Sequence, residues 1–413
     1  MKPKYLYPAL ISIFFLYLSS LQAQNQKIIK TGIEVLRSDG FGLLKGKNVG
    51  LITNPTGVDS QLKSTIDILF EAKGVKLVAL FGPEHGVRGD VYAGEKIESA
   101  KDPVTGLPVY SLYGNTHKPT PEMLEGIDVL VYDIQDIGCR SYTYISTMGK
   151  AMEAAAENNI EFIVLDRPNP LGGKKIEGPV AEEKFFSMVG AFPIPYVYGM
   201  TAGELAGFLN GEKLLKSKCK LTVVPMEGWK RSMTYNETGL KWVQTSPHVP
   251  YYETAFFYVA SGILGELIPI NIGIGYTLPF QLFGAEWIDA HKMAEAMNAL
   301  SLKGVIFRPI YYKPYYSKQA NNLLGGVQFF LTEPEKVNLM SIQFLFLQEH
   351  HKLYPEIDIL KLSEGRINMF DKVCGTDQIR QKFFENYNYA DIKNLLNNDV
   401  DKFRRMSKKY YLY

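Results

Sequence analysis

The chain has 413 residues, of which 46% are hydrophobic and 21% are charged, as in an ordinary globular protein. Such a length suffices for a large core and about two domains. Its 45 basic and 43 acidic residues leave a net charge of +2, so no basic face is indicated and nucleic acid is not an expected partner. The three cysteines, Cys139, Cys219 and Cys374, are widely spaced, which argues against a disulfide framework and a zinc site.

Residues 1–23 are predicted to be a secretory signal peptide and not part of the fold. Lys2 and Lys4 precede an apolar run that ends near Leu18, and small and polar residues follow it. This run is too short for a stable membrane span, and cleavage after Ala23 fits the pattern. No cysteine lies near that position to carry a lipid anchor. We therefore expect an exported protein without stable membrane insertion after cleavage.

Strands and helices alternate from about residue 27 onward. Apolar runs predict strands over residues 49–54, 76–82, 126–133, 161–166 and 220–226, and helices over residues 64–74 and 142–159. Thr201 and Glu204 form the pattern of a capping box that opens a further helix. Nearly continuous apolar strands separated by helices are typical of a parallel sheet covered on both faces. The sequence therefore predicts an α/β domain over residues 27–245.

The pattern changes near residues 245–248. Residues 253–287 are apolar but are interrupted by glycines, so we expect them to cross between domains or to form the wall of a cleft. Two short strands, 304–312 and 325–332, and two helices, 336–354 and 377–387, are predicted in the last part of the chain. These elements indicate a smaller α/β or α+β domain over residues 246–413.

Polar residues follow four of the predicted strands. In open α/β sheets, binding sites form outside the carboxyl ends of the strands, so we expect these side chains to meet in one crevice. They are Asn54, Glu84, His85, Asp133, Gln135, Asp136, Asp166, Arg167 and Asn169. The alternative is that they are ordinary caps and turn formers at the starts of loops.

The motifs of several enzyme classes are missing from the sequence. No Gly-x-Gly-x-x-Gly follows the first strand, and neither a Walker A motif nor a nucleophile elbow occurs. We expect no metal and no organic cofactor. Carboxylates remain as the reactive groups of the expected crevice. Paired carboxylates are typical of glycoside hydrolases, in which one protonates the leaving oxygen and the other attacks, stabilises or activates water.

Several longer motifs resemble those of one known family. They are GLITNPTGVD (50–59), FGPEHGVRGD (81–90), TGLPVYSLYG (105–114), DVLVYDIQDIGCRSYTYISTM (128–148), VLDRPNPLGGKKIEGPV (164–180), PIPYVYGMTAGELA (193–206), TSPHVP (245–250) and FDKVCGTDQIR (370–380). In their residues and their order along the chain, these motifs resemble the exo-β-N-acetylmuramidase (NamZ-like) family of peptidoglycan-recycling glycoside hydrolases, formerly a family of unknown function. The motifs span nearly the whole chain after the signal peptide.

The resemblance implies a Rossmann-like N-terminal domain, a smaller C-terminal domain and a cleft between them. It implies release of terminal β-N-acetylmuramic acid from the non-reducing end of peptidoglycan fragments, by a secreted protein whose expected compartment is the periplasm. It also implies two catalytic glutamates. Glu84 matches the first, as a general acid or acid/base, and Glu177 is our prediction for the second. Glu161 is a rival, but its position inside a strand favours a structural role.

Two positions depart from the family pattern. Ile274 stands where relatives carry an arginine between two glycines, and His248 stands where asparagine is more usual. N-acetylmuramic acid carries a lactyl carboxylate, for which an arginine is a natural partner. The departure leaves the exact sugar open, and we expect Arg88, Arg140 or Arg167 to supply the charge. The residues predicted to bind substrate are Asn54, His85, Arg88, Asp133, Gln135, Asp136, Arg140, Tyr142, Asp166, Arg167, Asn169, His248 and Glu266.

Alternatives of other classes stay open. A non-catalytic protein that binds cell-wall glycans or muropeptides would keep the fold without turnover, and the enzyme could also act on a different cell-wall sugar. An esterase or amidase would need Ser141 or Ser246 within hydrogen-bond reach of His85 or His248. For a glycosidase, retaining, inverting and substrate-assisted mechanisms all fit the sequence, because the separation of the carboxyl groups decides among them.

Overall fold

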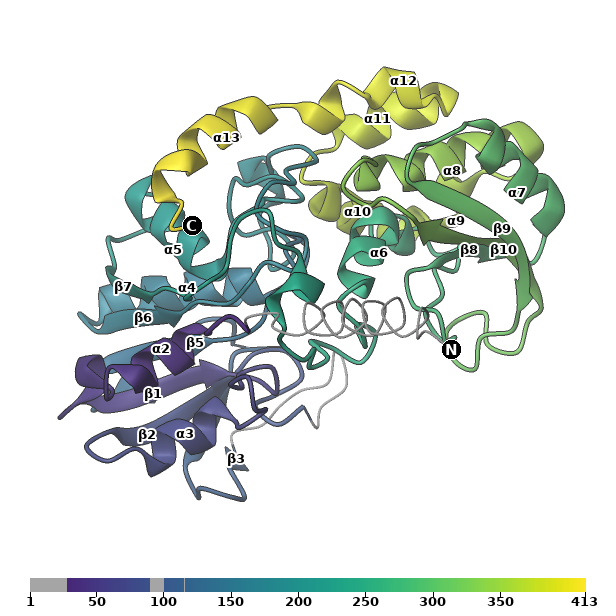
Figure 1. The fold of residues 1–413 in the computed structure, drawn as a ribbon. Coiled ribbons are helices and arrows are strands. Elements are labelled where there is room, and N and C mark those ends of the chain that lie inside the picture. The colour runs from purple at the N-terminus through teal and green to yellow at the C-terminus, as the bar shows by residue number, and fades with distance from the viewer. Residues whose placement is uncertain (1–27, 90–99, 115) are drawn as a thin grey trace, which may run out of the picture.

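The computed structural model describes residues 28–89, 100–114 and 116–413 (Figure 1). The predicted signal peptide lies outside the described residues. In the part of the chain that is described, no helix is both long enough and apolar enough to cross a membrane.

The larger sheet has seven strands in the order β3-β4-β2-β1-β5-β6-β7. Every neighbouring pair is parallel except β3 and β4, which are antiparallel. The strands are β1 (Asn48–Thr53), β2 (Lys76–Gly82), β3 (Ala100–Lys101), β4 (Pro108–Ser111), β5 (Val129–Asp133), β6 (Glu161–Leu165) and β7 (Lys220–Val224). Because β2, β1, β5 and β6 are parallel neighbours, the loops that leave them start at one edge of the sheet.

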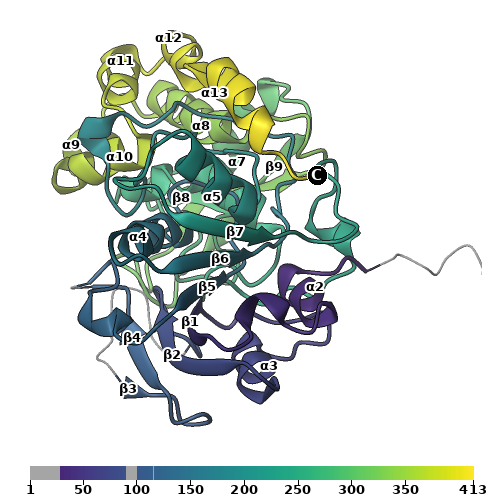
Figure 2. The same ribbon diagram turned by 90° about the vertical axis from the view of Figure 1, so that its left-hand side faces the viewer.

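Helices cover both faces of this sheet (Figure 2). Side chains alternate along each strand, so Leu51 and Val131 pack with helices α2 (Gly32–Ser38) and α3 (Thr65–Glu71). Leu130 and Phe162 point the other way and belong to the core that includes helices α4 (Tyr144–Glu157) and α5 (Ala202–Gly211). The expected parallel sheet with two covered faces is confirmed.

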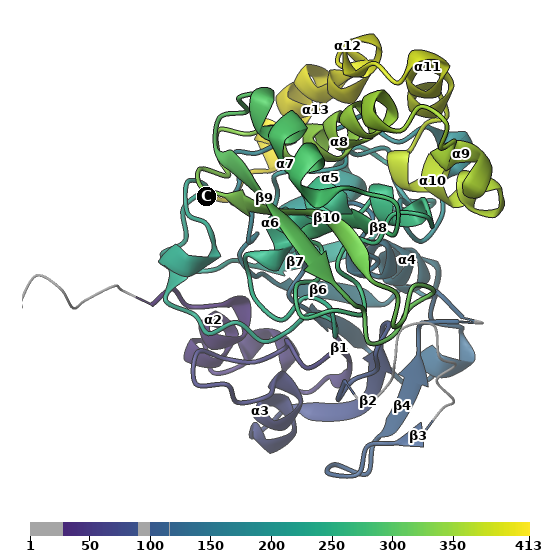
Figure 3. The same ribbon diagram turned by 90° about the vertical axis from the view of Figure 1, so that its right-hand side faces the viewer.

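The second part of the chain contains a small antiparallel sheet of order β8-β10-β9 (Figure 3). Its strands are β8 (Leu282–Ala285), β9 (Val305–Tyr312) and β10 (Leu324–Leu331). Helices α7 (Ala290–Ala299) and α8 (Leu339–Leu353) pack against it, and the rings of Phe283 on β8 and Phe346 on α8 lie 4.6 Å apart. Helix α6 (Thr254–Ser261) lies between the two sheets in Figure 1.

Short helices complete the chain and return it to the first part. They are α9 (Ile359–Leu362), α10 (Ile367–Cys374), α11 (Gln378–Asn386), α12 (Tyr389–Ile392) and α13 (Val400–Ser407). Phe403 on α13 contacts Phe208 on α5, with ring centroids 5.1 Å apart. The predicted α/β architecture with a smaller mixed second part is confirmed. Strands β3, β4 and β8 and helices α2, α6, α7, α9, α10, α12 and α13 were not predicted.

Candidate active site

A cavity of about 250 Å³ lies beyond the end of β2 and contains the predicted Glu84 and His85. Six further segments complete its wall: Tyr113, the residues before and at the start of α4, Val189, residues 246–249, Tyr258 on α6, and Phe280. The lining residues are Glu84, His85, Tyr113, Ser141, Tyr142, Thr143, Tyr144, Val189, Ser246, Pro247, His248, Val249, Tyr258 and Phe280. Of residues 253–287, for which a crossing between domains or a cleft wall was expected, Tyr258 and Phe280 line the cavity.

Glu84 is partly buried, and hydroxyl groups hold its carboxylate. The hydroxyl of Thr143 donates a hydrogen bond to Glu84 Oε2 at 3.1 Å. The phenol of Tyr113 also interacts with Glu84: burial first, and then this carboxylate, raise the pKa of Tyr113 to about 12. The phenol therefore stays protonated at neutral pH and remains a hydrogen-bond donor. Both contacts hold the carboxyl group in one orientation within the cavity.

Two residues of the cavity have left-handed backbone conformations. His85 has φ 73° and Phe280 has φ 66°. A non-glycine residue in this region costs free energy, of the order of 1 kcal/mol, and such residues cluster at functional sites. Gly86 follows His85 with φ 76° and continues the left-handed turn. The Pro-Glu-His-Gly sequence thus forms a tight turn that places both Glu84 and His85 at the cavity, directly after the buried strand β2.

His248 reaches the cavity from the segment that precedes α6. Its Nε2 lies 2.5 Å from the phenol oxygen of Tyr316. Burial lowers the pKa of His248, and the nearby His85 lowers it further. The two imidazoles are therefore close enough to influence each other's charge, although they are far apart in sequence.

Aromatic rings form much of the remaining wall. Because Tyr142 and Tyr144 lie two residues apart, helical periodicity would place them on different faces, yet both line the cavity. Helix α4 begins at Tyr144, so Tyr142 lies before the helix and is free of its periodicity. The two rings meet edge to face at 4.9 Å, and Tyr142 also meets Tyr258 at 5.7 Å. Such a wall suits the apolar face of a sugar ring.

Asp133 and Arg167 do not reach the cavity. They form a buried ion pair in which Arg167 Nε lies 2.5 Å and Nη2 2.9 Å from the carboxylate oxygens of Asp133. The hydroxyl of Thr65 donates to the same carboxylate. A space of only about 10 Å³ remains beside Arg167, and Tyr235 and Leu240 from a later loop enclose it. These two side chains are therefore not among the residues that line the Glu84 cavity, and their predicted role in substrate binding stays a prediction.

Other polar residues after the strands stabilise turns. Asn54 Oδ1 accepts a hydrogen bond from the backbone N–H of Thr56 at 3.0 Å. Asn169 Oδ1 accepts from the N–H of Leu171 at 2.9 Å, and its amide donates to a backbone carbonyl. The amide of Gln135 donates to the carbonyl of Pro168 at 2.7 Å. For Asn54, Gln135 and Asn169 the alternative of caps and turn formers fits, and the substrate-binding prediction does not.

Asp136 and Asp166 are buried carboxyl groups with raised pKa values. Burial raises the pKa of Asp136 to about 7, although hydrogen bonds from Tyr198 and from the backbone at Gly138 oppose this shift. Burial likewise raises the pKa of Asp166 to about 6. Asp166 accepts hydrogen bonds from the Thr201 hydroxyl at 2.7 Å and the Tyr413 phenol at 2.7 Å. Neither aspartate lines the cavity of Glu84, and the contacts of both are with groups of the protein itself; their predicted role in substrate binding stays a prediction.

The remaining charged residues that were predicted to bind substrate have partners within the protein. Arg88 forms a bidentate pair with Asp102, at 2.8 and 3.0 Å. Arg140 is fully buried and donates only to backbone carbonyls. Glu266 is ion-paired with Arg366. The prediction that Arg88, Arg140 or Arg167 binds the lactyl carboxylate is therefore not supported, and Glu266 does not line the cavity.

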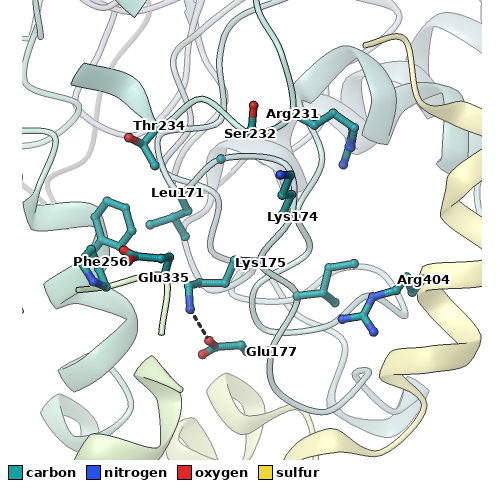
Figure 4. Close-up of a pocket in the computed structure, with 13 residues that line it drawn as sticks. Leu171, Lys174, Lys175, Glu177, Arg231, Ser232, Thr234, Phe256, Glu335 and Arg404 are labelled. Carbon is teal, nitrogen blue, oxygen red and sulfur yellow. Dashed lines mark hydrogen bonds and ion pairs between the residues drawn. The ribbon is translucent and has the colours of Figure 1, made fainter. Parts of the chain in front are cut away.

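Glu177 lies in a different pocket from Glu84 (Figure 4). That pocket, of about 380 Å³, also contains Lys175, whose Nζ lies 2.8 Å from Glu177 Oε1. Glu177 Oε2 accepts a hydrogen bond from the backbone N–H of Met340, in the first turn of α8, at 3.3 Å. Buried in an ion pair at the start of a helix, Glu177 links the two parts of the chain. This placement does not fit the predicted role as the partner of Glu84. The rival Glu161 is ion-paired with Lys47 at 2.7 Å in β6, as expected of a structural residue.

The two serines considered as possible nucleophiles, Ser141 and Ser246, form hydrogen bonds with groups other than the two histidines. Ser141 Oγ lies 3.2 Å from the Tyr258 phenol, 3.3 Å from the Tyr196 phenol and 3.4 Å from the Cys139 thiol. The hydroxyl of Ser246 interacts with the phenol of Tyr142. An acyl-transfer nucleophile needs a base as its partner, so these contacts do not favour an esterase or amidase. Among the described residues, no group of three or more His, Cys, Asp or Glu side chains could hold a metal ion.

Sequence reasoning missed several lining residues. Pro247 and Val249 belong to the TSPHVP motif, which could have identified them, and Ser246 of the same motif was named only as a possible acyl-transfer nucleophile. Thr143 lies in another of the quoted motifs. No sequence pattern pointed to Tyr258 or Val189 as cavity residues. Tyr258 lies on helix α6, which was not predicted, and a single valine cannot be distinguished from a core residue by sequence.

Models of one family match almost all of the described chain. Residues 49–253 match the N-terminal and residues 256–413 the C-terminal model of exo-β-N-acetylmuramidase NamZ. The chain belongs to the exo-β-N-acetylmuramidase NamZ family. It is 47% identical, over 395 residues, to the peptidoglycan β-N-acetylmuramidase NamZ of Bacillus subtilis (strain 168). The match covers 96% of this chain and 94% of that relative.

Two crystal structures of DUF1343 family proteins from Bacteroides fragilis NCTC 9343 are also similar. One is 58% identical with a TM-score of 0.90, and the other is 30% identical with a TM-score of 0.74. Each match covers 93% of this chain and 99% of the other. These two structures share the fold of this protein over nearly its whole chain. The domain boundary at residue 245 stays a prediction.

Proposed function

We propose that this protein is an exo-acting glycoside hydrolase that releases terminal β-N-acetylmuramic acid from the non-reducing end of peptidoglycan fragments. The observation that carries the proposal is the position of Glu84, a carboxylate held by two hydroxyl donors in a cavity walled by aromatic rings. The family and the peptidoglycan-cleaving relative support the choice of reaction and substrate. The predicted signal peptide supports action outside the cytoplasm, and we propose the periplasm.

The size of the cavity supports exo action. Its volume of about 250 Å³ is below the range of about 300–1,000 Å³ typical of sites for drug-sized ligands. One sugar ring fits such a space, whereas a run of several sugars would need an open groove. The edge-to-face rings of Tyr142, Tyr144 and Tyr258 offer apolar surface to that single ring.

Glu84 acts in this proposal as the general acid that protonates the leaving glycosidic oxygen. Of the described residues that line the cavity, it is the only carboxylate, and Glu177 lies in another pocket. This favours the substrate's own acetamide oxygen as the nucleophile at the anomeric carbon. Glu84 then removes a proton from the water that opens the resulting ring intermediate, so the sugar is released with retained β configuration.

The test compares two matched Glu→Gln variants on a chromogenic β-N-acetylmuraminide and the corresponding β-N-acetylglucosaminide. Wild-type protein should release the chromophore from the muraminide, and Glu84→Gln should lower kcat by about 100-fold or more. Glu177→Gln should keep kcat in its folded fraction, because Glu177 belongs to an ion pair away from the cavity. Nuclear magnetic resonance of the first-formed sugar reports its anomeric configuration.

Two outcomes would overturn parts of this proposal. Release from neither substrate by the wild-type protein, with binding of muropeptides intact, would indicate a glycan-binding protein. A large loss of kcat in Glu177→Gln, or an inverted product, would reject the single-carboxylate mechanism.

A further inference from the structure

The Glu84 cavity contains a pair of imidazoles that the proposed hydrolysis does not use. His85 comes from the turn after β2, and His248 comes from the segment between the two parts of the chain. Of the described residues that line the cavity, these two are the only ones whose side chains can carry a positive charge. The arginines that the sequence suggested for this purpose are bound to Asp102, to Asp133 or to backbone carbonyls.

The surroundings of His248 prepare it to donate a hydrogen bond. Its Nε2 lies 2.5 Å from the Tyr316 phenol oxygen. When this phenol donates to Nε2, the proton of the neutral imidazole resides on Nδ1, which is then a donor. The titratable groups around His248 are His85, whose positive charge opposes protonation, and Tyr316; Glu84 lines the same cavity.

We propose that His248, together with His85, binds the lactyl carboxylate of N-acetylmuramic acid and thereby distinguishes this sugar from N-acetylglucosamine, which lacks that group. The inference rests on the proposed function and names the residues that select its substrate. A carboxylate accepts hydrogen bonds from both imidazoles, and its negative charge stabilises their protonated forms. The anion thus offsets the two effects, burial and mutual repulsion, that oppose the protonation of His248 in the empty cavity.

The proposal makes the selectivity dependent on pH. The lactyl carboxylate is ionised throughout the neutral range, so the change of charge at this contact comes from His248. In the free protein the pKa of His248 lies below its ordinary value, so His248 is mostly neutral at pH 7. Lower pH supplies the proton that anion binding needs. The affinity for N-acetylmuramic acid should therefore rise as pH falls, whereas the affinity for N-acetylglucosamine should not.

The experiment measures binding of the two free sugars by calorimetry in the Glu84→Gln background, in which hydrolysis is disabled. The dissociation constants are compared at about pH 5.5 and about pH 7.5 with those of the double variants Glu84→Gln/His248→Gln and Glu84→Gln/His291→Gln. We expect the parent to prefer N-acetylmuramic acid by about tenfold or more at the lower pH, because a charge-assisted hydrogen bond contributes that much. The preference should shrink at the higher pH and be lost in the His248 variant.

His291 is exposed on α7 and is the matched control, so its variant should keep both dissociation constants. An unchanged, pH-dependent preference in the His248 variant would overturn the inference, even if the wild-type protein cleaves the muraminide as proposed. Failure of the wild-type protein to cleave any muraminide would instead reject the proposed function. The two failures are therefore distinguishable.

Discussion

Asp136 shows how burial changes the chemistry of a single residue. Gly138 N donates a hydrogen bond to its Oδ2 at 2.7 Å, and the Tyr198 phenol donates to the same oxygen. Burial nevertheless dominates and raises the pKa of the carboxyl group to about 7. In the sequence alone, this carboxyl group just after a strand is predicted to bind substrate. In the structure the space beside it is only about 10 Å³, too small for a sugar.

This raised pKa predicts a dependence of stability on pH. The folded-state pKa of Asp136 is above its unfolded value of about 3.9, so the folded protein binds the proton more tightly. Its contribution to stability is complete below about pH 4 and is lost as pH rises through about 7, at up to about 1.4 kcal/mol per pH unit. Asp136→Asn should therefore lose less unfolding free energy between pH 5 and pH 8 than the wild-type protein, as measured by urea unfolding. Parallel profiles for the two proteins would contradict this assignment.

At the scale of elements, helix α5 combines local and tertiary contacts at its first turn. Thr201 and Glu204 form the predicted capping box: the N–H of Glu204 donates to the Thr201 hydroxyl oxygen at 3.2 Å, and Glu204 Oε2 accepts from the N–H of Thr201 at 3.1 Å. The Thr201 hydroxyl also donates to Asp166 at 2.7 Å, which joins the helix to the end of β6. Glu204 in turn pairs with Arg231 at 2.7 Å. One local motif therefore also organises the loops at the edge of the sheet.

Substitution of Thr201 should show this double role. Thr201→Val keeps the shape of the side chain but removes both the cap and the donor to Asp166, so we expect a loss of about 1–2 kcal/mol of unfolding free energy. Thr201→Ser retains the hydroxyl and should remain close to the wild-type value. Urea unfolding of the two variants checks the prediction, and equal stabilities would show that the hydroxyl contributes little.

At the scale of the whole molecule, Arg140 joins the two parts of the chain. Its guanidinium donates to the carbonyls of Pro179 and Ile194 at 2.7 and 2.8 Å, and to those of Val373 and Cys374 at 2.9 and 2.8 Å. The last two carbonyls end helix α10, where backbone acceptors lack partners within the helix and a positive charge is favourable. Burial lowers the pKa of Arg140 to about 10, so the group remains charged at neutral pH.

Loss of this link should destabilise the whole protein. Arg140→Met removes the Arg140 donor from four buried carbonyls, of which that of Ile194 keeps another backbone donor, the N–H of Ala181, and we expect a loss of at least about 3 kcal/mol of unfolding free energy. Arg405→Met is the control at an exposed arginine and should change stability by less than about 0.5 kcal/mol. Chemical unfolding measures both variants. A stable Arg140 variant that fails to bind N-acetylmuramic acid would instead support the role in carboxylate binding that the sequence suggested.

The sequence by itself determined the parallel sheet, the smaller second part and the position of Glu84. Strands such as residues 76–82 are recognisable because fully buried strands are continuously apolar, and the predicted bounds of β2 are those of the structure. Glu84 could be predicted because the turn that presents it, Pro83–Gly86, is encoded within the same short motif. Each of these features is marked by a local pattern of residues, although the strands that pair in the sheet are far apart in the chain.

Only the tertiary structure decided which polar residues reach the cavity. Asp133 and Arg167 follow strands at the same edge as Glu84, but a loop containing Tyr235 covers them and they neutralise each other. Tyr258 and Phe280 come to the cavity from the second part of the chain. Contacts over such separations depend on how the sheet, its loops and α6 pack together, and the local pattern of residues does not encode this packing.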